Sequence, residues 1–474
     1  MLRVPMDSSV DTIFGLATAS PMKQGSGIAV VRLSGPDAFE IAGRLCDPEL
    51  DPQVIPDRRF MLVSLVHEGR AIDRAGLLAF HRPKSYTGED VVEFHCHGGI
   101  AVIRALQAAL EESGARPAEP GEFTRRGFLN GRYDLVQAEA VAALVGAAGE
   151  AARREALRQR SGGLSERVEA IREKLRDILA RMEVDFDYPE ERVDGMTSEE
   201  AVKLIEAIRA EVKPLLASWE TGRLLGGIRL AIIGRPNVGK SSLLNALLDE
   251  DRAIVTPTPG TTRDVVSGSL TFGGVPAEVL DTAGIRAIAA GSDTAEAEGV
   301  RRSWREVERA HLVLLVFDVS SPLTEEDSEL VSEARWRTKQ PGGALLLVCN
   351  KIDLPSACEA DIVGPLVGAP DLPHVAVSAR TGEGLDGLRA CVRELLNLEV
   401  SAEEILLTES RHRALLAESD GILQRVREDL GGEMPQDVAA TELWGADRAL
   451  GRLLGEGLEA GDLDEIFSRF CIGK

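Results

Sequence analysis

Residues 234–241 read Gly-Arg-Pro-Asn-Val-Gly-Lys-Ser and match the G-x-x-x-x-G-K-S pattern of a phosphate-binding loop. An apolar, strand-like run at 228–233 leads into this loop, and a helix-like run at 242–248 leads out of it. A strand before the loop and a helix after it form the setting in which the pattern binds nucleotide phosphates. The backbone N–H groups cradle the phosphates, Lys240 reaches the outer ones, and the Ser241 hydroxyl suits Mg²⁺. We therefore predict a nucleotide-binding domain that begins in the middle of the chain.

The length and the charge of the chain restrict its class. A chain of 474 residues is long enough for about two to four domains with sizeable cores. Its net charge of −23 argues against a protein that holds RNA or DNA mainly through its own phosphate contacts. The six cysteines are scattered, as is typical of a reducing compartment. The start of the chain lacks the layout of a signal peptide, and no apolar run is long enough to span a bilayer. We expect a cytoplasmic protein that does not enter a membrane.

Changes in composition divide the chain into four segments. Residues 1–133 mix short β-like runs with Gly and Pro, which predicts a compact α+β domain. Residues 134–227 and 399–474 have helical patterns, whereas residues 228–398 alternate apolar strands with helices. We expect the nucleotide domain at 228–398 to be inserted into a helical domain whose two parts are 134–227 and 399–474.

The same patterns predict individual elements. We expect strands at 27–33, 76–80, 91–95, 279–280, 312–319 and 344–350, a helix at 101–112, and helical stretches at 135–184 and 198–220. The first helical stretch is broken once, at 161–163, and the segment 185–191 separates it from the second.

Four further motifs follow the phosphate loop in the order that a GTPase requires. Thr262 offers a second hydroxyl ligand for Mg²⁺, and Asp281, in an Asp-x-x-Gly element, adds a carboxylate on the metal side. Asp353 can accept hydrogen bonds from guanine N1–H and from the N2 amine, a pairing that adenine lacks. Segment 378–380 brings a backbone N–H near guanine O6. The predicted GTP-binding residues are Asn237, Val238, Gly239, Lys240, Ser241, Ser242, Thr256, Pro257, Thr258, Pro259, Gly260, Thr261, Thr262, Asp281, Thr282, Ala283, Gly284, Asn350, Lys351, Asp353, Ser378, Ala379 and Arg380.

The sequence lacks the usual residue for positioning the attacking water. Many regulatory GTPases carry a Gln directly after the Asp-x-x-Gly element, whereas this chain has Ile285, which can neither orient nor polarise water. Another group must supply the orientation, and another positive charge must act beside the phosphates. The amide oxygen of Asn237 could bind a monovalent cation there, or Asn237 could only cap the loop, and the residues alone leave both alternatives open.

Motifs along the whole chain, from Asp11 to Lys474, resemble the MnmE (TrmE) family of tRNA-modification GTPases. The most specific segments are Tyr86–Asp90, His97–Gly99, Pro120–Thr124, Arg126–Asn130, Asp134–Ala140, the phosphate loop, Gly260–Asp264 and Asp464–Lys474. Other GTPases share only the motifs of the middle segment, so the two ends of the chain carry the resemblance.

The resemblance implies a GTPase that is activated by potassium and by dimerisation of its nucleotide domains. Asn237 matches the family's K⁺ ligand, and Thr256, Thr258 and Thr261 match the loop that completes the cation's shell. The K⁺ would supply the positive charge that other systems take from an arginine finger. The family's water-orienting glutamate aligns with Glu296, and Glu298 is the alternative. Glu296 and Lys240 are thus the residues predicted to act in catalysis at this site.

The N-terminal segment resembles the family's folate-binding and dimer-forming domain. The implied ligand is a tetrahydrofolate derivative that carries a one-carbon unit, such as 5-formyl- or methylene-tetrahydrofolate. By motif position Arg32, Glu93 and Arg132 would line its pocket, and the Glu93 carboxylate could pair with the adjacent N–H donors of a pterin ring. Arg132 stands where the family often has Lys, which keeps the charge but changes the contact geometry.

The C-terminal tail, Cys471-Ile-Gly-Lys474, reaches the folate pocket under the same resemblance. Lys474 would then contact folate, and Cys471 would be a candidate catalytic thiol. A buried structural cysteine in a terminal helix is the equally weighted alternative.

The family resemblance implies a homodimer that acts with an FAD-containing partner of the MnmG (GidA) type, in a heterotetramer or a larger complex. This complex would modify C5 of the wobble uridine of tRNA, to aminomethyl or carboxymethylaminomethyl uridine, with most of the tRNA held by the partner. We also considered a ribosome-assembly GTPase that acts as a binding switch, and a plain folate-dependent one-carbon transferase with a regulatory GTPase insert. The first alternative predicts a basic RNA-binding domain, whereas both flanks of the nucleotide domain are acidic or mixed.

Overall fold

The computed structural model describes residues 11–18, 26–187, 196–254, 270–280, 304–338, 343–399, 404–431, 434–470 and 473. These residues form two compact units. The first unit comprises 1–142, 159–176 and 441–474, and the second comprises 143–158 and 177–440. Among the helices of the described ranges, none combines the length and the apolar character that a membrane crossing requires.

A seven-stranded sheet with the order β3-β4-β5-β6-β2-β1-β7 forms the core of the first unit. Paired strands are antiparallel except for β1 and β7, which are parallel. The strands are β1 (Ile13–Leu16), β2 (Ile28–Ser34), β3 (Cys46–Asp47), β4 (Met61–His67), β5 (Arg70–Phe80), β6 (Val91–His97) and β7 (Arg116–Pro117), with a 3₁₀ turn, η1 (Pro52–Val54), before β4. The three strands expected in this segment are therefore confirmed, and β5 begins earlier than its apolar pattern indicated.

The two faces of this sheet differ. Alternate residues of β2, such as Val31 and Leu33, are buried against α1 (Ala38–Arg44) and α2 (Ile100–Glu112). The opposite face carries three large apolar side chains that are about 60% exposed, namely Ile28 at 61%, Phe60 at 59% and Leu62 at 60%. We call this face, with its three exposed apolar side chains Ile28, Phe60 and Leu62, the open face of the sheet.

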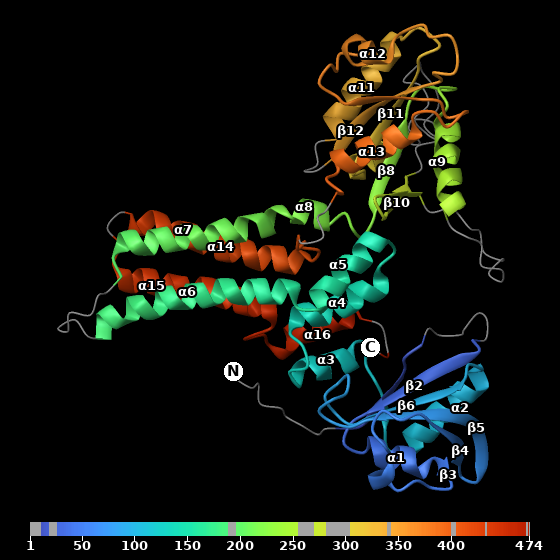
Figure 1. The fold of residues 1–474 in the computed structure, drawn as a ribbon, viewed down its shortest axis with the longest axis vertical. Coiled ribbons are helices and arrows are strands. Elements are labelled where there is room, and N and C mark those ends of the chain that lie inside the picture. Colours follow the sequence, from blue (N-terminus) through green and yellow to red (C-terminus); the bar gives the residue numbers. More distant parts are fainter. Residues whose placement is uncertain are drawn as a thin grey trace, which may run out of the picture. The chain divides into compact units, whose positions relative to one another are not determined.

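Helices account for most of the remaining chain outside the nucleotide-binding segment. They are α3 (Glu122–Leu129), α4 (Leu135–Gly146), α5 (Glu150–Arg160), α6 (Gly163–Asp187), α7 (Ser198–Ala217), α8 (Trp219–Gly222), α14 (Ser410–Leu430), α15 (Gln436–Leu454) and α16 (Ala460–Ser468). In the second unit, α7 and α14 lie side by side (Figure 1), and Arg209 of α7 pairs with Asp420 of α14 at 2.8 Å. α7 begins at Ser198, as expected, because Thr197 and Glu200 form a capping box.

Two helix boundaries differ from the expected ones. The stretch 135–184 is broken twice, since residues 147–149 separate α4 from α5 in addition to the expected break, which lies at 161–162. A Cβ on Gly149 would lie 2.4 Å from the Gly274 carbonyl oxygen, so this close backbone approach explains a turn that helical periodicity does not reveal. α6 also continues to Asp187, three residues into the segment that we expected to separate the helices.

The nucleotide-binding segment contains a six-stranded sheet with the order β13-β12-β11-β8-β10-β9. All paired strands are parallel except β9 and β10. The elements are β8 (Ile228–Ile233), α9 (Lys240–Ile254), β9 (Leu270–Phe272), β10 (Val275–Val279), β11 (Leu312–Asp318), α11 (Glu325–Arg337), β12 (Ala344–Asn350), α12 (Ala360–Leu366), β13 (His374–Val377) and α13 (Leu385–Leu395). The expected buried parallel strands at 312–319 and 344–350 are confirmed as β11 and β12. The strand expected at 279–280 is instead the end of β10, which excludes Leu280 and is only partly buried.

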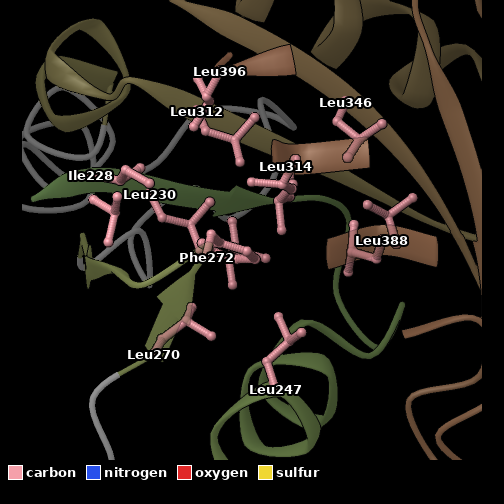
Figure 2. Close-up of a cluster of buried hydrophobic side chains, with 14 of the residues drawn as sticks. Ile228, Leu230, Leu247, Leu270, Phe272, Leu312, Leu314, Leu346, Leu388 and Leu396 are labelled. Carbon is pink, nitrogen blue, oxygen red and sulfur yellow. The ribbon is translucent and has the colours of Figure 1, made fainter. Parts of the chain in front are cut away.

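Side chains of successive strand residues pack on opposite faces of this sheet. Leu312 and Leu314 join the core beneath α9 and α13 (Figure 2), whereas Val313 and Leu315 join the core beneath α11 and α12. Burial on both faces explains why the strands are continuous apolar runs. The parallel strands β8, β11 and β12 end at the same edge, where loops of an open α/β sheet bind ligands.

Candidate nucleotide-binding site

The phosphate-binding loop connects β8 to α9, and its backbone requires glycine at two positions. Gly234 has φ +157° and Gly239 has φ +100°. A Cβ on Gly234 would lie 2.4 Å from the Val316 carbonyl oxygen, and a Cβ on Gly239 would lie 2.2 Å from Asn350 Nδ2. At both positions, therefore, glycine is required for two reasons: the backbone has a positive φ, and a Cβ would clash with a neighbouring atom. Asn237 has φ +64°, a left-handed conformation that Asn tolerates better than most residues.

Lys240 lies at the end of this loop and points back into it. Its ammonium donates hydrogen bonds to the carbonyl oxygens of Gly234, at 2.8 Å, and Arg235, at 2.7 Å. Ser241 and Ser242 follow in the first turn of α9, and both are exposed. The loop thus gathers a cation, two hydroxyls and the start of a helix, which is a suitable environment for phosphate oxygens and their Mg²⁺.

Asn350 connects the phosphate-binding loop to the predicted base-binding residues. It is the last residue of β12, is almost completely buried, and donates from Nδ2 to the Val238 carbonyl oxygen at 2.8 Å. Its Oδ1 accepts a hydrogen bond from the Ala379 N–H at 3.0 Å. The structure therefore brings three of the predicted motifs together, and within segment 378–380 it gives the Ala379 N–H a protein partner.

Asp353 is oriented by the following motif. The buried Ser378 hydroxyl donates to Asp353 Oδ1 at 2.7 Å, and Ser378 Oγ accepts a hydrogen bond from the Thr381 N–H at 3.1 Å. Arg380 Nε lies 3.6 Å from Asp353 Oδ2, although the Arg380 side chain is 80% exposed. The carboxylate is thus held in one orientation at the edge of the sheet, as recognition of a planar base requires.

One ion pair beside these residues was missing from our sequence prediction. Lys351 Nζ lies 2.5 Å from Asp318 Oδ2, and Asp318 Oδ1 accepts hydrogen bonds from the Ser320 N–H and hydroxyl. Burial acts to raise the pKa of Asp318, but the hydrogen bonds from Lys351 and Ser320 outweigh it and lower the pKa. An acid that directly follows an apolar strand run, as Asp318 follows 312–317, is the signal that could have identified it.

Several predicted site residues lie outside the described residues. They are Thr256, Pro257, Thr258, Pro259, Gly260, Thr261, Thr262, Asp281, Thr282, Ala283, Gly284, Glu296, Glu298, Cys471 and Lys474. Their predicted roles stay predictions.

The predicted folate-binding residues Arg32 and Glu93 meet on the sheet of the first unit. They face each other across β2 and β6, and Arg32 Nη2 lies 2.9 Å from Glu93 Oε1. The Arg32 guanidinium also stacks on two rings, 5.0 Å from the centroid of Tyr86 and 5.6 Å from that of Phe123. Arg132 lies beside the loop that carries Tyr86, since its Nε donates to the Ser85 carbonyl oxygen at 3.1 Å.

A partly buried ion network holds that loop against α3. Arg126 of α3 donates to Asp11, Glu89 and Glu122, at 2.8, 3.2 and 2.9 Å. Burial acts to raise the pKa of Glu122, but a hydrogen bond from Arg116 and the charge of Arg126 outweigh it and lower the pKa. These residues belong to the segments 86–90, 120–124 and 126–130 or contact them, so the network explains why these motifs occur together.

Gly473, the described residue of the C-terminal tail, lies against the same part of the sheet. Gly15 on β1 pairs with Arg32 on β2. A Cβ added to Gly15 would lie 3.3 Å from Gly473 Cα. A Cβ on Gly473 would itself lie 2.1 Å from the Leu16 carbonyl oxygen. Gly15 and Gly473 thus approach each other closely because neither carries a side chain, and this places Gly473 beside the strand that pairs with β2 at Arg32.

Comparisons with known proteins give a consistent result. A family model described as the MnmE helical domain matches residues 135–471, and one described as the GTP-binding protein TrmE N-terminus matches residues 12–132. Two relatives, one from Nostoc sp. and one from a strain of Thermus thermophilus, are each named tRNA modification GTPase MnmE. The first is 42% identical over 98% of this chain and 99% of its own length, and the second is 44% identical over 97% and 98%.

One solved structure also resembles part of the chain. The G domain of the T. maritima FeoB iron transporter is 26% identical and covers 36% of this chain and 98% of its own, with a TM-score of 0.26. That TM-score is too low to support a fold assignment.

Proposed function

The chain belongs to the MnmE family of tRNA modification GTPases, and we propose that it hydrolyses GTP in a potassium-dependent cycle that serves wobble-uridine modification. The single observation that carries the GTPase assignment is the hydrogen-bonded link from the phosphate-binding loop through Asn350 to the Ala379 N–H. The relatives' names favour this function over the ribosome-assembly alternative, because both of the full-length relatives described above are named for tRNA modification.

The phosphate end of the site would hold GTP through its backbone and its cation. The N–H groups of the loop and the ammonium of Lys240 bind phosphate oxygens, and the carbonyl contacts of Lys240 keep the ammonium within the loop. Mg²⁺ fits this site because Ser241 offers an exposed hydroxyl at the start of α9, with Thr262 as the second protein ligand, and it supplies charge to the phosphates. Glu296, or alternatively Glu298, would orient the attacking water.

A monovalent cation would complete the site. Asn237 is exposed at the tip of the loop and carries the amide oxygen that K⁺ prefers, with Thr256, Thr258 and Thr261 as further oxygen ligands. The cation supplies the positive charge that other GTPases take from an arginine finger.

We expect wild-type GTP hydrolysis to be at least about ten-fold faster in KCl than in NaCl of equal ionic strength. Asn237→Ala should hydrolyse GTP equally slowly in both salts. Asn237→Gly separates the two alternatives for this residue, since Gly adopts φ +64° without strain but has no amide oxygen. Loss of the potassium effect in both variants would support the cation site. A full potassium effect in Asn237→Gly would show that Asn237 only shapes the turn of the loop and does not bind the cation.

We propose that the N-terminal domain binds a tetrahydrofolate derivative at Arg32 and Glu93, with Arg132, Lys474 and Cys471 nearby. The residues fit such a ligand, because the Glu93 carboxylate matches adjacent pterin N–H donors and the partly exposed Arg32 guanidinium offers further hydrogen-bond donors. Folate would carry the carbon that is transferred. Cys471 either reacts as a thiol or is structural.

Binding of 5-formyl-tetrahydrofolate to the full chain tests this domain. Glu93→Gln should weaken binding by about ten-fold or more, because one carboxylate hydrogen-bond pair contributes about 1.5–3 kcal/mol. Glu111→Gln, an exposed change of the same chemistry on α2, should leave binding unchanged. If wild type and Glu93→Gln bind 5-formyl-tetrahydrofolate with equal affinity, Glu93 does not contact the ligand.

We propose that the chain forms a homodimer through the open face of the N-terminal sheet. Ile28, Phe60 and Leu62 would be buried by a second copy, which would explain three large apolar side chains left about 60% exposed. The dimer would act in the cytoplasm with an FAD-containing partner of the MnmG type, which holds most of the tRNA. The net charge of −23 fits this division of labour.

A further inference from the structure

Lys351 has an unusual backbone and a fixed side chain. Its φ of +70° is uncommon for a residue with a Cβ. Its ammonium pairs with Asp318 at 2.5 Å, and the Lys351 side chain is only 28% exposed. A lysine side chain that is free to rotate carries about 2 kcal/mol of rotamer entropy, so an anchor at its charged end preorganises the whole stem.

Asp318 is itself held in place by the sheet. It is the last residue of β11 and lies directly opposite Asn350, the residue before Lys351, in the parallel register of β11 and β12. The Val319 N–H donates to the Asn350 carbonyl oxygen at 3.1 Å. Ser320 donates twice to Asp318 Oδ1, which leaves Oδ2 directed at Lys351.

In the sequence, Lys351 lies between Asn350, at the phosphate end of the nucleotide site, and Asp353, at the base end. Asn350 contacts the phosphate-binding loop, and Asp353 is the predicted guanine-reading carboxylate. A lysine stem that is fixed at its tip presents its methylene groups along a defined path, and such stems pack against apolar and aromatic surfaces. Lys351 is two residues from Asp353, so the guanine base that Asp353 is proposed to read is the nearest surface against which the Lys351 stem can pack.

We propose that Asp318 is a positioning residue for nucleotide recognition, which acts by holding Lys351 in the conformation that packs against the guanine base. This inference rests on the proposed role of Asp353 as the residue that reads guanine. Both carboxylate oxygens of Asp318 already accept hydrogen bonds from the protein, so Asp318 acts through Lys351 and does not itself need to contact GTP.

The test is the affinity of the full chain for fluorescent GDP and GTP analogues, together with the steady-state constants for GTP. Asp318→Asn removes the charge and keeps the shape. We expect nucleotide affinity to fall and KM to rise by about ten-fold, with kcat within about two-fold of wild type, because the ion pair orders the ground-state binding site rather than the reacting phosphate. Unchanged affinity would overturn the proposal.

Asp371→Asn is the matched control. Asp371 lies in the same domain and pairs with Arg335 at 2.7 Å, so the control also removes one acidic charge and one ion pair. We expect wild-type affinity from it. An equal loss of affinity in both variants would show a general effect of charge or stability and would overturn the proposal.

A double-mutant cycle separates positioning from a structural role. In a Lys351→Met background, Asp318→Asn should weaken binding by less than about two-fold further, because the group that it positions is absent. Additive effects of the two changes would contradict the proposal. Asp318→Glu, which keeps the charge and moves the carboxylate by one methylene, provides a second variant if Asp318→Asn folds poorly. It should weaken binding partially, and wild-type affinity from it would count against the proposal.

Base specificity distinguishes failure of this inference from failure of the guanine assignment. Asp318→Asn should keep the wild-type ratio of GTP to XTP affinity, whereas Asp353→Asn should invert it. If Asp353→Asn leaves the ratio unchanged, the guanine assignment itself is wrong. If Asp353→Asn inverts the ratio while Asp318→Asn leaves affinity unchanged, only the positioning role is wrong.

Discussion

Gly239→Ala is expected to lower GTP affinity by about a hundred-fold or more, and GTP hydrolysis at ordinary substrate concentration with it. Gly239 has φ +100°, which an alanine adopts only with strain. The added methyl group would lie 2.2 Å from Asn350 Nδ2, so Asn350 or the loop would have to move. Because Asn350 holds both Val238 and the Ala379 N–H, this displacement would affect both ends of the nucleotide site.

Titration with a fluorescent GDP analogue measures this effect directly, and thermal unfolding shows whether the variant folds. Gly387→Ala is the matched control in the same domain, since its Cβ would meet only Val375 Cγ2 at an ordinary 3.7 Å. Gly387 lies within α13, where alanine is favoured over glycine by about 1 kcal/mol, so this variant should bind nucleotide normally and unfold at a slightly higher temperature. Wild-type affinity in Gly239→Ala would contradict the close contact between this loop and Asn350.

Asp353→Asn is expected to exchange the preferred base, with GTP affinity reduced by about 10³-fold or more and XTP bound better than GTP. The carboxylate accepts from guanine N1–H and the N2 amine, whereas the asparagine amide would leave one of these donors without an acceptor. Xanthine has an oxygen where guanine has the amine, so the asparagine N–H can donate to it. The Ser378 hydroxyl can still donate to the Asn Oδ1, as it does to Asp353 at 2.7 Å, so the orientation of the side chain is retained.

Competition of GTP and XTP for the bound fluorescent nucleotide measures the exchange. Asp371→Asn serves again as the control for loss of one acidic side chain in the same domain. If Asp353→Asn loses affinity for both nucleotides equally, the residue stabilises the loop and does not read the base. If it keeps its preference for GTP, another residue selects guanine.

The sequence predicted the elements of the nucleotide-binding segment well because their signals are local. Apolar runs such as 312–317 become buried parallel strands, and the polar residues after them reach one edge of the sheet. The G-x-x-x-x-G-K-S pattern at 234–241 already predicted Gly234 and Gly239, the two positions where the backbone of the loop requires glycine. Helix breaks were predicted less well, since the turn at 147–149 results from a contact with Gly274 more than a hundred residues away.

The sequence predicted the role of a side chain only where that side chain belongs to a recognised motif. Asp353 was identified because the guanine N1–H and N2 amine require a carboxylate acceptor, and Asn350 was identified as part of the same motif. Asp318 was not identified, because it meets Lys351 only through the register of β11 against β12. Arg126 likewise meets Asp11 and Glu89 only after α3 packs against the sheet.

By itself, then, the sequence determined the phosphate-binding loop, the order of the GTPase motifs and the family, because each motif is a short run of neighbouring residues that can be recognised without knowing what it contacts. Only the tertiary structure decided which distant side chains are partners, namely Asp318 with Lys351 and Arg126 with Asp11, and that Gly473 lies against Gly15. Strand register and close backbone packing create these contacts, and neither leaves a periodic signal in a single sequence.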